Sequence, residues 1–153
     1  MFKKKIVNWA RTNSCVPKKI YKPHTEEQLI SIIQEHIKTK TPLKVCGKKH
    51  SYNTIFHPNK NGSLLSLENL NAIENIDQKN KQVTFQTGIS TIYLLKHLKL
   101  YHLTIPNLGT NIMDNYIGAS SNGYHGSGIT YQIQSSQIQS MDVITGTGKK
   151  ITI

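Results

Sequence analysis

The chain has 153 residues, the length of one ordinary domain, and 19 basic against 8 acidic residues give it a formal net charge of +11. A chain of this length buries a core without disulfide staples. The sequence contains no run of 18 apolar residues, which excludes a membrane-spanning helix, and its start, MFKKKIVNWARTNS, lacks the apolar stretch of a secretory signal. We therefore expect a soluble, cytoplasmic chain that forms one domain or part of one.

The positive charge raises the question of nucleic-acid binding, because a strongly basic domain is its usual footprint. All basic residues except Arg11 are lysines, whereas specific base readout favours the bidentate guanidinium. The lysines are scattered, with pairs at 18–19, 48–49 and 149–150. These features favour a solvated basic surface, and a basic nucleic-acid-binding domain remains an alternative.

The cysteines predict neither a metal centre nor a disulfide. Cys15 and Cys46 form no C-x-x-C pair and have no histidine at ligand spacing. We expect two free thiols in a reducing compartment and no metal.

The first elements predict a βαβ unit. Residues 18–23 (KKIYKP) are β-prone and precede a helix in which Thr25 is the N-cap and Gln28 completes a capping box. A second strand follows at 43–46, and its direction should be parallel to the first. Apolar residues at helical spacing form the expected buried face of the helix: Leu29, Ile32, Ile33 and Ile37.

Regular elements continue after a polar loop. The loop GKKHSYN (47–53) follows the second strand, where α/β folds bind ligands. A hairpin is expected with Ile73 and Ile76 on one arm, a turn at 78–81, and Val83 and Phe85 on the other arm. A helix is expected over 90–100, with one stripe formed by Ile92, Leu95 and Leu98.

The last third of the chain contains most of the irregular backbone. Apolar periodicity fails between Tyr101 and Tyr131, and half of the ten glycines lie within the 20 residues from Gly109 to Gly128. Such crowding is typical of backbone that adopts positive φ or closely approaches a ligand. The tail predicts two strands, with GTGKK as the hairpin turn between them.

Two segments combine glycine, hydroxyl side chains and one histidine: GKKHSYN (47–53) and GASSNGYHGSG (118–128). Backbone N–H groups in such segments form concave anion sites, to which serine and lysine side chains add donors. The pattern therefore indicates an anion or nucleotide site. It does not indicate a Rossmann site, because G-x-G-x-x-G after the first strand is missing, and GTGKK departs from the P-loop pattern.

These segments, in this order with NWA (8–10), PNLG (106–109) and MDVITGTGKKI, carry a resemblance over nearly the whole chain. The sequence resembles the PCMH-type FAD-binding domain of the vanillyl-alcohol oxidase / p-cresol methylhydroxylase flavoprotein superfamily, and within it the alditol, gulonolactone and arabinonolactone oxidases. The resemblance implies an α+β fold in which a lead-in, 1–17, precedes an FAD-binding domain, 18–153. That domain would consist of two small α/β subdomains, about 18–65 and 66–153, with FAD between them.

The resemblance also implies a set of cofactor-binding residues. His50 falls where relatives form a covalent bond from the imidazole to the 8α-methyl group of the flavin. The pyrophosphate would be held around it by Gly47, Lys48, Lys49 and Ser51. Residues that line FAD in relatives match Thr110, Asn115, Gly118, Asn122, Gly123, Tyr124 and His125. Since 104–113 contains no cysteine, we expect no second, cysteinyl link.

The implied activity is oxidation of a CH–OH group of a sugar alcohol or aldonolactone by hydride transfer to flavin. Relatives carry a second domain that binds this substrate, and they extend their FAD domain beyond the position of Ile153, so we expect a truncated, C-terminally incomplete domain and name no catalytic residue. A partner chain could supply the missing part; alternatively, the chain is a non-catalytic flavin-binding fragment or remnant that needs a partner. His125 would contact the cofactor or orient its loop. The remaining histidines are expected on the surface: His24, His36, His57, His97 and His102.

Overall fold

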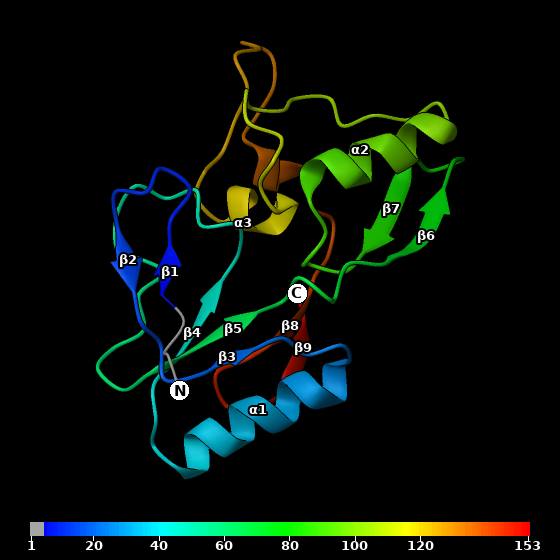
Figure 1. Ribbon diagram of the computed structural model, residues 1–153. Coiled ribbons are helices and arrows are strands. Elements are labelled where there is room, and N and C mark those ends of the chain that lie inside the picture. Colours follow the sequence, from blue (N-terminus) through cyan, green and yellow to red (C-terminus); the bar gives the residue numbers. More distant parts are fainter. Residues whose placement is uncertain (1–4) are drawn as a thin grey trace. The chain divides into compact units, whose positions relative to one another are not determined.

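The computed structural model describes residues 5–153, which divide into two compact units (Figure 1). Of the described residues, the first unit contains 5–69 together with Ser140–Ile153, and the second contains Leu70–Gln139. Residues 1–4 of the expected lead-in lie outside the described residues. The mixture of helices and strands confirms the α+β class. The division differs from the expected one at the tail, because 140–153 groups with the first unit.

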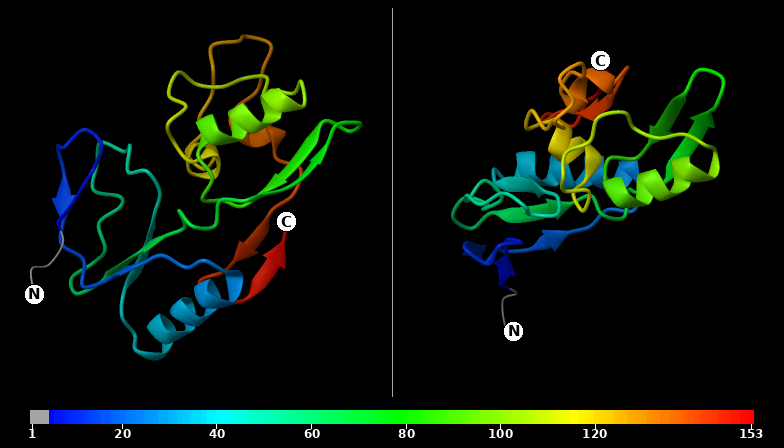
Figure 2. Two further views of the ribbon diagram at one scale, coloured as in Figure 1. Left: turned by 45° about the vertical axis from the view of Figure 1, so that its right-hand side comes forward. Right: turned by 90° about the horizontal axis from the view of Figure 1, so that it is seen from above.

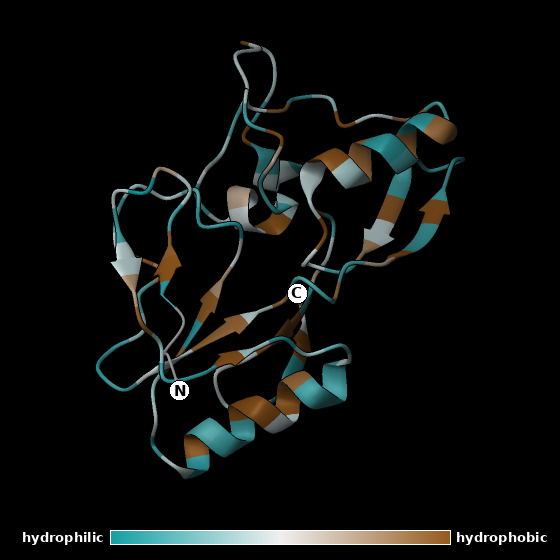
Figure 3. Ribbon diagram, viewed as in Figure 1, coloured by the Kyte–Doolittle hydropathy of each residue, from teal (hydrophilic) through white to brown (hydrophobic). Residues whose placement is uncertain are grey.

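A parallel three-stranded sheet forms the centre of the first unit. Its strands lie in the order β3-β5-β4, and both pairs are parallel. The βαβ prediction is confirmed in strand direction, but the two predicted strands are not neighbours, because β5 lies between them. All four residues of β5 are buried, and brown segments mark the apolar strands in Figure 3. The bounds are β3 Ile20–Tyr21, β4 Leu43–Cys46 and β5 Ser63–Ser66.

Helix α1 (Glu26–Lys38) begins as its capping residues predict. The Thr25 hydroxyl accepts from the Gln28 N–H at 3.3 Å, and the Gln28 side chain accepts from the His24 N–H at 2.8 Å. Leu29 is buried, as expected. These bonds satisfy two N–H groups at the start of the helix.

The C-terminal half of α1 corrects two expectations. Ile37, predicted on the buried face, is 49% exposed, while His36, predicted on the surface, is buried. The His36 ring packs edge-on against Tyr21, with 5.3 Å between centroids, and its Nδ1 lies 2.8 Å from the Thr41 hydroxyl. A hydrogen-bonded imidazole therefore takes the inward position of the last turn.

The tail forms the predicted hairpin, with β8 at Asp142–Ile144 and β9 at Lys150–Thr152. Gly148 has a φ of 76°, which confirms the turn at GTGKK. Figure 2 shows this red hairpin beside α1. Lys150 Nζ lies 2.9 Å from Glu26 Oε2 and 3.2 Å from Asp142 Oδ2. The pairing with the first turn of α1 explains why the tail groups with the first unit.

The lead-in contains a small hairpin that the sequence analysis did not predict. Strands β1 (Ile6–Val7) and β2 (Ser14–Cys15) pair antiparallel, and we call Ile6–Cys15 the N-terminal hairpin. Its Ile6 and Cys15 pack against a buried cluster formed by Cys46, Phe56 and Leu64. The hairpin is thereby fixed to the end of β4.

The second unit contains the predicted hairpin and helix. Strands β6 and β7 pair antiparallel, and α2 lies within the expected range. The most buried residues of α2 are Thr91, Leu94 and Leu98, so the buried stripe is rotated from the predicted one. Two short helices, α3 and η1, were not predicted. The bounds are β6 Ile73–Asp77, β7 Gln82–Phe85, α2 Thr91–Leu100, α3 Tyr116–Ser120 and η1 Gln134–Gln137.

The core of the second unit is formed by Ile89, Leu94, Leu98 and Tyr116, with the apolar side chains of the β6–β7 hairpin packed against it. Burial raises the pKa of the Tyr116 hydroxyl.

Within 5–153, no helix has both the length and the apolar character needed to cross a membrane.

Candidate functional site

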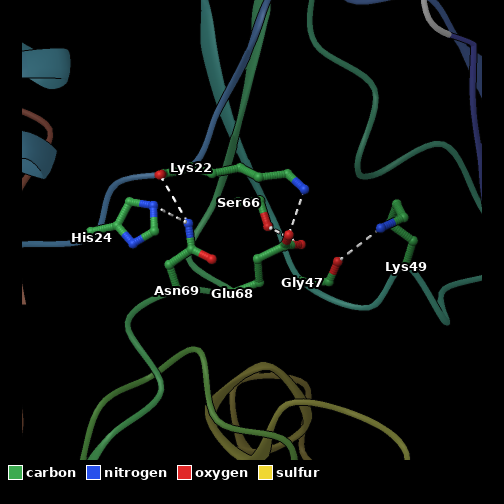
Figure 4. Close-up of polar contacts among 7 residues, drawn as sticks. All are labelled: Lys22, His24, Gly47, Lys49, Ser66, Glu68 and Asn69. Atoms are coloured by element: carbon green, nitrogen blue, oxygen red, sulfur yellow. Dashed lines mark hydrogen bonds and ion pairs between the residues drawn. The ribbon is translucent and has the colours of Figure 1, made fainter.

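The carboxyl ends of β3, β4 and β5 meet at one edge of the first unit and bring polar residues together (Figure 4). Lys22 Nζ lies 2.5 Å from Glu68 Oε1, and the Ser66 hydroxyl donates to the other Glu68 oxygen at 3.0 Å. Asn69 Nδ2 donates to the Lys22 carbonyl at 3.1 Å and lies 3.1 Å from His24 Nε2. Sequence reasoning missed these residues, although each lies at or just after the end of a parallel strand, which is where α/β ligand sites form.

The charges at this edge act on one another. The hydrogen bond from Lys22 holds the pKa of the Glu68 carboxyl below its ordinary value of 4.5, with the Ser66 hydroxyl and the charge of Lys48 acting in the same direction against partial burial. Lys48, one of the predicted pyrophosphate residues, is exposed. The edge therefore contains one carboxylate already compensated by Lys22 and further lysines in the loop 47–53.

The N-terminal hairpin donates hydrogen bonds to three backbone carbonyl groups of the loop 47–53. The Trp9 N–H donates to the Lys49 carbonyl at 2.9 Å, Asn8 Nδ2 to the Ser51 carbonyl at 3.1 Å, and Asn13 Nδ2 to the Tyr52 carbonyl at 2.6 Å. The C=O and N–H of a trans peptide point in opposite directions. The next backbone N–H groups, of His50, Tyr52 and Asn53, therefore point away from the hairpin.

Lys49 adopts a left-handed backbone, with a φ of 60°. This conformation costs a non-glycine residue roughly 1 kcal/mol. Its ammonium group donates to the Gly47 carbonyl at 3.3 Å (Figure 4). Burial raises the pKa of the Cys15 and Cys46 thiols. The positive charge of Lys49 opposes this effect, but burial is the larger of the two.

His50 lies at the centre of this loop. Its imidazole is half-buried and stacks on the Trp9 indole, with ring centroids 5.3 Å apart and planes inclined by 19°. Ser51 is half-buried and its carbonyl is held by Asn8. The structure thus brings the first predicted group, 47–51, together on one supported loop.

In the second unit, the segment 109–111 lies against Tyr124. The Tyr124 hydroxyl accepts from the Asn111 N–H at 2.8 Å and donates to the Asn111 carbonyl at 2.7 Å. A Cβ at Gly109 would overlap the Tyr124 ring. Thr110, between Gly109 and Asn111 in the chain, is exposed. Tyr124 therefore orders the loop that presents Thr110, and its hydroxyl is engaged within the chain.

Asn115 and Asn122 also serve the local backbone. Asn115 Nδ2 donates to the Gly88 carbonyl at 2.6 Å and to the Ile89 carbonyl at 3.1 Å, so both amide hydrogens are used within the chain. Asn122 Nδ2 donates to the Gly118 carbonyl at 2.6 Å. These bonds fix the start and the end of α3.

The backbone at Gly118 and Gly123 is open. A Cβ at Gly118 would meet its nearest neighbour at 3.7 Å, and one at Gly123 would meet nothing within 4 Å. Gly123 has a φ of 68°. The exposed His125 ring bonds its own loop, with Nδ1 2.8 Å from the Gly126 carbonyl oxygen. This agrees with an orienting role for His125.

The donor set suits a dinucleotide with a pyrophosphate. In the first unit, Lys48 and Lys49 directly precede the backbone N–H groups that point away from the hairpin, and such a combination binds phosphate oxygens. In the second unit, the open backbone at Gly118 and Gly123 permits close approach of a flat ligand. Within residues 5–153, no three His, Cys, Asp or Glu side chains are grouped so that they could hold a metal ion.

The comparisons with known proteins identify the class. Residues 17–153 match the family model described as FAD binding domain, so the chain belongs to this family of FAD-binding flavoprotein domains. FAD is therefore the cofactor that the family assigns to the chain, and the resemblance drawn from the motifs is confirmed.

Among curated proteins, the chain is 25% identical to an alditol oxidase from a Streptomyces species over 97% of its length, covering 35% of that protein. It is 30% identical to an L-gulonolactone oxidase from Scyliorhinus torazame over 92% of its length, covering 32% of that protein. The chain therefore spans about a third of the length of these relatives.

Among solved structures, a TM-score of 0.77 relates the chain to Phl p 4.0202, a glucose dehydrogenase, at 14% identity, with 88% of this chain and 28% of that one covered. A 6-hydroxy-D-nicotine oxidase from Arthrobacter nicotinovorans gives a TM-score of 0.76 at 20% identity, with 88% and 29% covered. These similarities confirm the PCMH-type fold.

Proposed function

We propose that the chain is the FAD-holding part of an oxidoreductase that oxidises a CH–OH group of a sugar alcohol or aldonolactone. The names of the similar curated proteins support this substrate class. When bound, FAD supplies a two-electron acceptor for the hydride of the carbinol carbon. We further propose that the substrate, a small polyol or sugar lactone, is bound by a further domain or by a partner chain.

In this proposal the loop 47–51 holds the pyrophosphate. Lys48 and Lys49 neutralise its charge, and the backbone and hydroxyl donors of Gly47, His50 and Ser51 bind its oxygens. The positive charge of this loop also attracts the anionic cofactor from solution.

In the second unit, the open backbone at Gly118 and Gly123 lets FAD approach closely. Thr110, Asn122 and His125 contact it from the same segments, while Asn115 and Tyr124 hold the backbone that does so.

His50 would carry the covalent link to the 8α-methyl group. The single observation that supports it most is the stacking of the His50 ring on Trp9 at the centre of a loop with three tethered carbonyls. A surface histidine does not require such support, whereas a covalently attached one must present its ring in one orientation.

The test is the absorption of the 153-residue chain, incubated with FAD and then precipitated with acid. We expect bands at about 370 and 450 nm, typical of oxidised flavin, and we expect the colour in the acid pellet. In His50→Ala the colour should move to the supernatant. His97→Ala is the matched control, since His97 is a half-buried histidine of α2 outside the proposed site, and its colour should stay in the pellet.

Two outcomes contradict the proposal at different levels. Flavin that stays in the pellet of His50→Ala would remove the link from His50 and keep the cofactor. No flavin bound to the wild-type chain would remove the proposed function.

We also propose a cytoplasmic location. Its support is the pair of free cysteines, Cys15 and Cys46. Free thiols are typical of reducing compartments.

A further inference from the structure

The N-terminal hairpin lies before residue 17, where the match to the FAD binding domain family begins. The hairpin nevertheless contacts the loop 47–53 through one ring and three hydrogen bonds. We propose that Trp9 is a positioning residue for His50, which sets the imidazole in the orientation needed for its covalent attachment to the flavin. This inference rests on the proposed function and names a further residue for it.

The exposure of Trp9 is the first observation. Its side chain is 63% exposed, although a tryptophan in a small domain is normally well buried. The indole stacks on the His50 ring, with planes inclined by 19°. Core packing therefore does not explain the position of this residue, whereas support of the imidazole does.

The backbone of the hairpin fixes Trp9 itself. The Trp9 N–H donates to the Lys49 carbonyl at 2.9 Å, directly before His50. Its neighbour Asn8 is 2% exposed, donates to the Ser51 carbonyl and accepts from the Asn13 N–H at 2.9 Å. The peptide that precedes His50 and the carbonyl group of Ser51 are thus bonded to the segment that carries the indole.

A stacked ring restricts the two torsions of the histidine side chain. The χ2 torsion of histidine is broad, so an unsupported imidazole samples many ring planes. A flat surface parallel to the ring excludes most of them, and orientation of this kind accelerates bond formation between held groups. Trp9 therefore acts through His50 and does not need to touch the cofactor.

The supported step balances as an oxidation. A bond forms between an imidazole nitrogen and the 8α carbon. The imidazole N–H and one methyl C–H would break, both hydrogens leaving as protons. The two electrons would reduce the flavin, and dioxygen would reoxidise it and be released as hydrogen peroxide.

The role is tested by the rate of covalent attachment at saturating FAD, followed by acid-stable absorption. We expect Trp9→Ala to slow attachment about tenfold while noncovalent affinity for FAD changes less than about threefold, because orientation is lost and binding donors are kept. Trp9→Phe, which keeps a flat ring, should restore most of the rate. Tyr93→Ala is the matched control, because Tyr93 contacts a histidine, His97, with centroids 4.1 Å apart in α2.

A second readout needs no flavin. Trp9 is the single tryptophan of the sequence, so the fluorescence of the chain reports the surroundings of this side chain. Removing the stacked ring in His50→Ala should increase quenching of the emission by acrylamide, whereas Tyr93→Ala should leave it unchanged. Equal quenching in the wild-type chain and His50→Ala would overturn the contact on which the inference depends.

The outcomes separate the inference from the proposed function. An unchanged attachment rate in Trp9→Ala, with flavin bound, would overturn the positioning role and leave the proposed function intact. A wild-type chain that binds no FAD would overturn both.

Discussion

The loop 47–53 and the segment 118–128 look alike in sequence, but the loop and the stretch 106–128, which contains that segment, are held in place by different means. The loop is tethered from outside, by side chains and one backbone N–H of the N-terminal hairpin that bind three of its carbonyl groups. The segment 106–128 is packed from within: the Tyr124 ring lies over Gly109, and Asn107 lies against Gly126.

The difference shows that glycine crowding has two separate causes. At Gly109 and Gly126, a side chain of the protein itself occupies the space that a Cβ would need. At Gly118 and Gly123, the space is open and stays accessible to a ligand. Of these two pairs, the second has the open backbone that suits cofactor contact, although the glycine count alone does not distinguish the two pairs.

The largest expected effect comes from a substitution that disrupts the packing of the segment 106–128. In Gly126→Ala, the new Cβ overlaps Asn107 Oδ1 and meets the Leu108 carbonyl oxygen at 2.6 Å, so the backbone must shift. We expect a loss of about 3 kcal/mol in the free energy of unfolding, measured with urea. Gly118→Ala, in a helix with space around it, is the control and should be neutral or gain up to about 1 kcal/mol. Equal losses in both variants would contradict the distinction between packed and open glycines.

The next largest effect comes from a substitution that removes a hydrogen bond between the N-terminal hairpin and the loop 47–53. Asn8→Ala removes the donor to the Ser51 carbonyl and the acceptor for the Asn13 N–H, both at a residue that is 2% exposed. We expect a loss of about 2 kcal/mol, with faster amide hydrogen exchange in 50–53. Asn80→Ala removes an exposed amide–carboxylate bond to Asp77 and should cost less than about 1 kcal/mol. Unchanged exchange in 50–53 would show that the hairpin does not hold the loop.

A smaller change sharpens the description of the packed segment. Tyr124→Phe keeps the ring over Gly109 and removes the hydroxyl that bonds both peptide groups of Asn111. We expect a loss of about 1 kcal/mol, because water can replace these bonds only in part. Chemical denaturation measures it. A loss as large as that of Gly126→Ala would mean that the hydroxyl, and not ring packing, holds the segment.

The smallest effect concerns charge at the strand edge beside the loop. The Lys22 ammonium holds the pKa of Glu68 below 4.5, so the stabilisation from this pair is present above that pH and is lost as the pH falls through the lowered pKa. The Glu68 side chain is 44% exposed, so Glu68→Gln should cost less than about 1 kcal/mol at pH about 7. The difference from wild type should vanish in acid, as followed by urea unfolding at several pH values. A constant difference across pH would show that the effect is not electrostatic.

Local signals in the sequence predicted most of the elements. The capping box at Thr25, the β6–β7 hairpin and the turn at Gly148 depend on neighbouring residues, and the structure contains all three. The insertion of β5 between β3 and β4 depends on a pairing across distant residues, which no local pattern encodes.

The inward position of His36 has the same kind of cause, because it follows from contacts with Tyr21 and Thr41. The site was predictable to the extent that its motifs are contiguous. The loop 47–53 is recognisable from its contiguous sequence. The support of His50 by Trp9 is not, because Trp9 lies 41 positions earlier in the chain and reaches His50 only through the fold.

The chain order of the units has a consequence for synthesis. The second unit is an insertion within the first, whose last residues include Lys150, the partner of Glu26 across 124 positions. A ribosome therefore releases the whole of Leu70–Gln139 before the first unit has its tail hairpin. The second unit can therefore complete its own contacts first. The first unit, although its synthesis begins earlier, is completed last, because the tail hairpin must pair with the distant helix α1 and such long-range contacts form slowly.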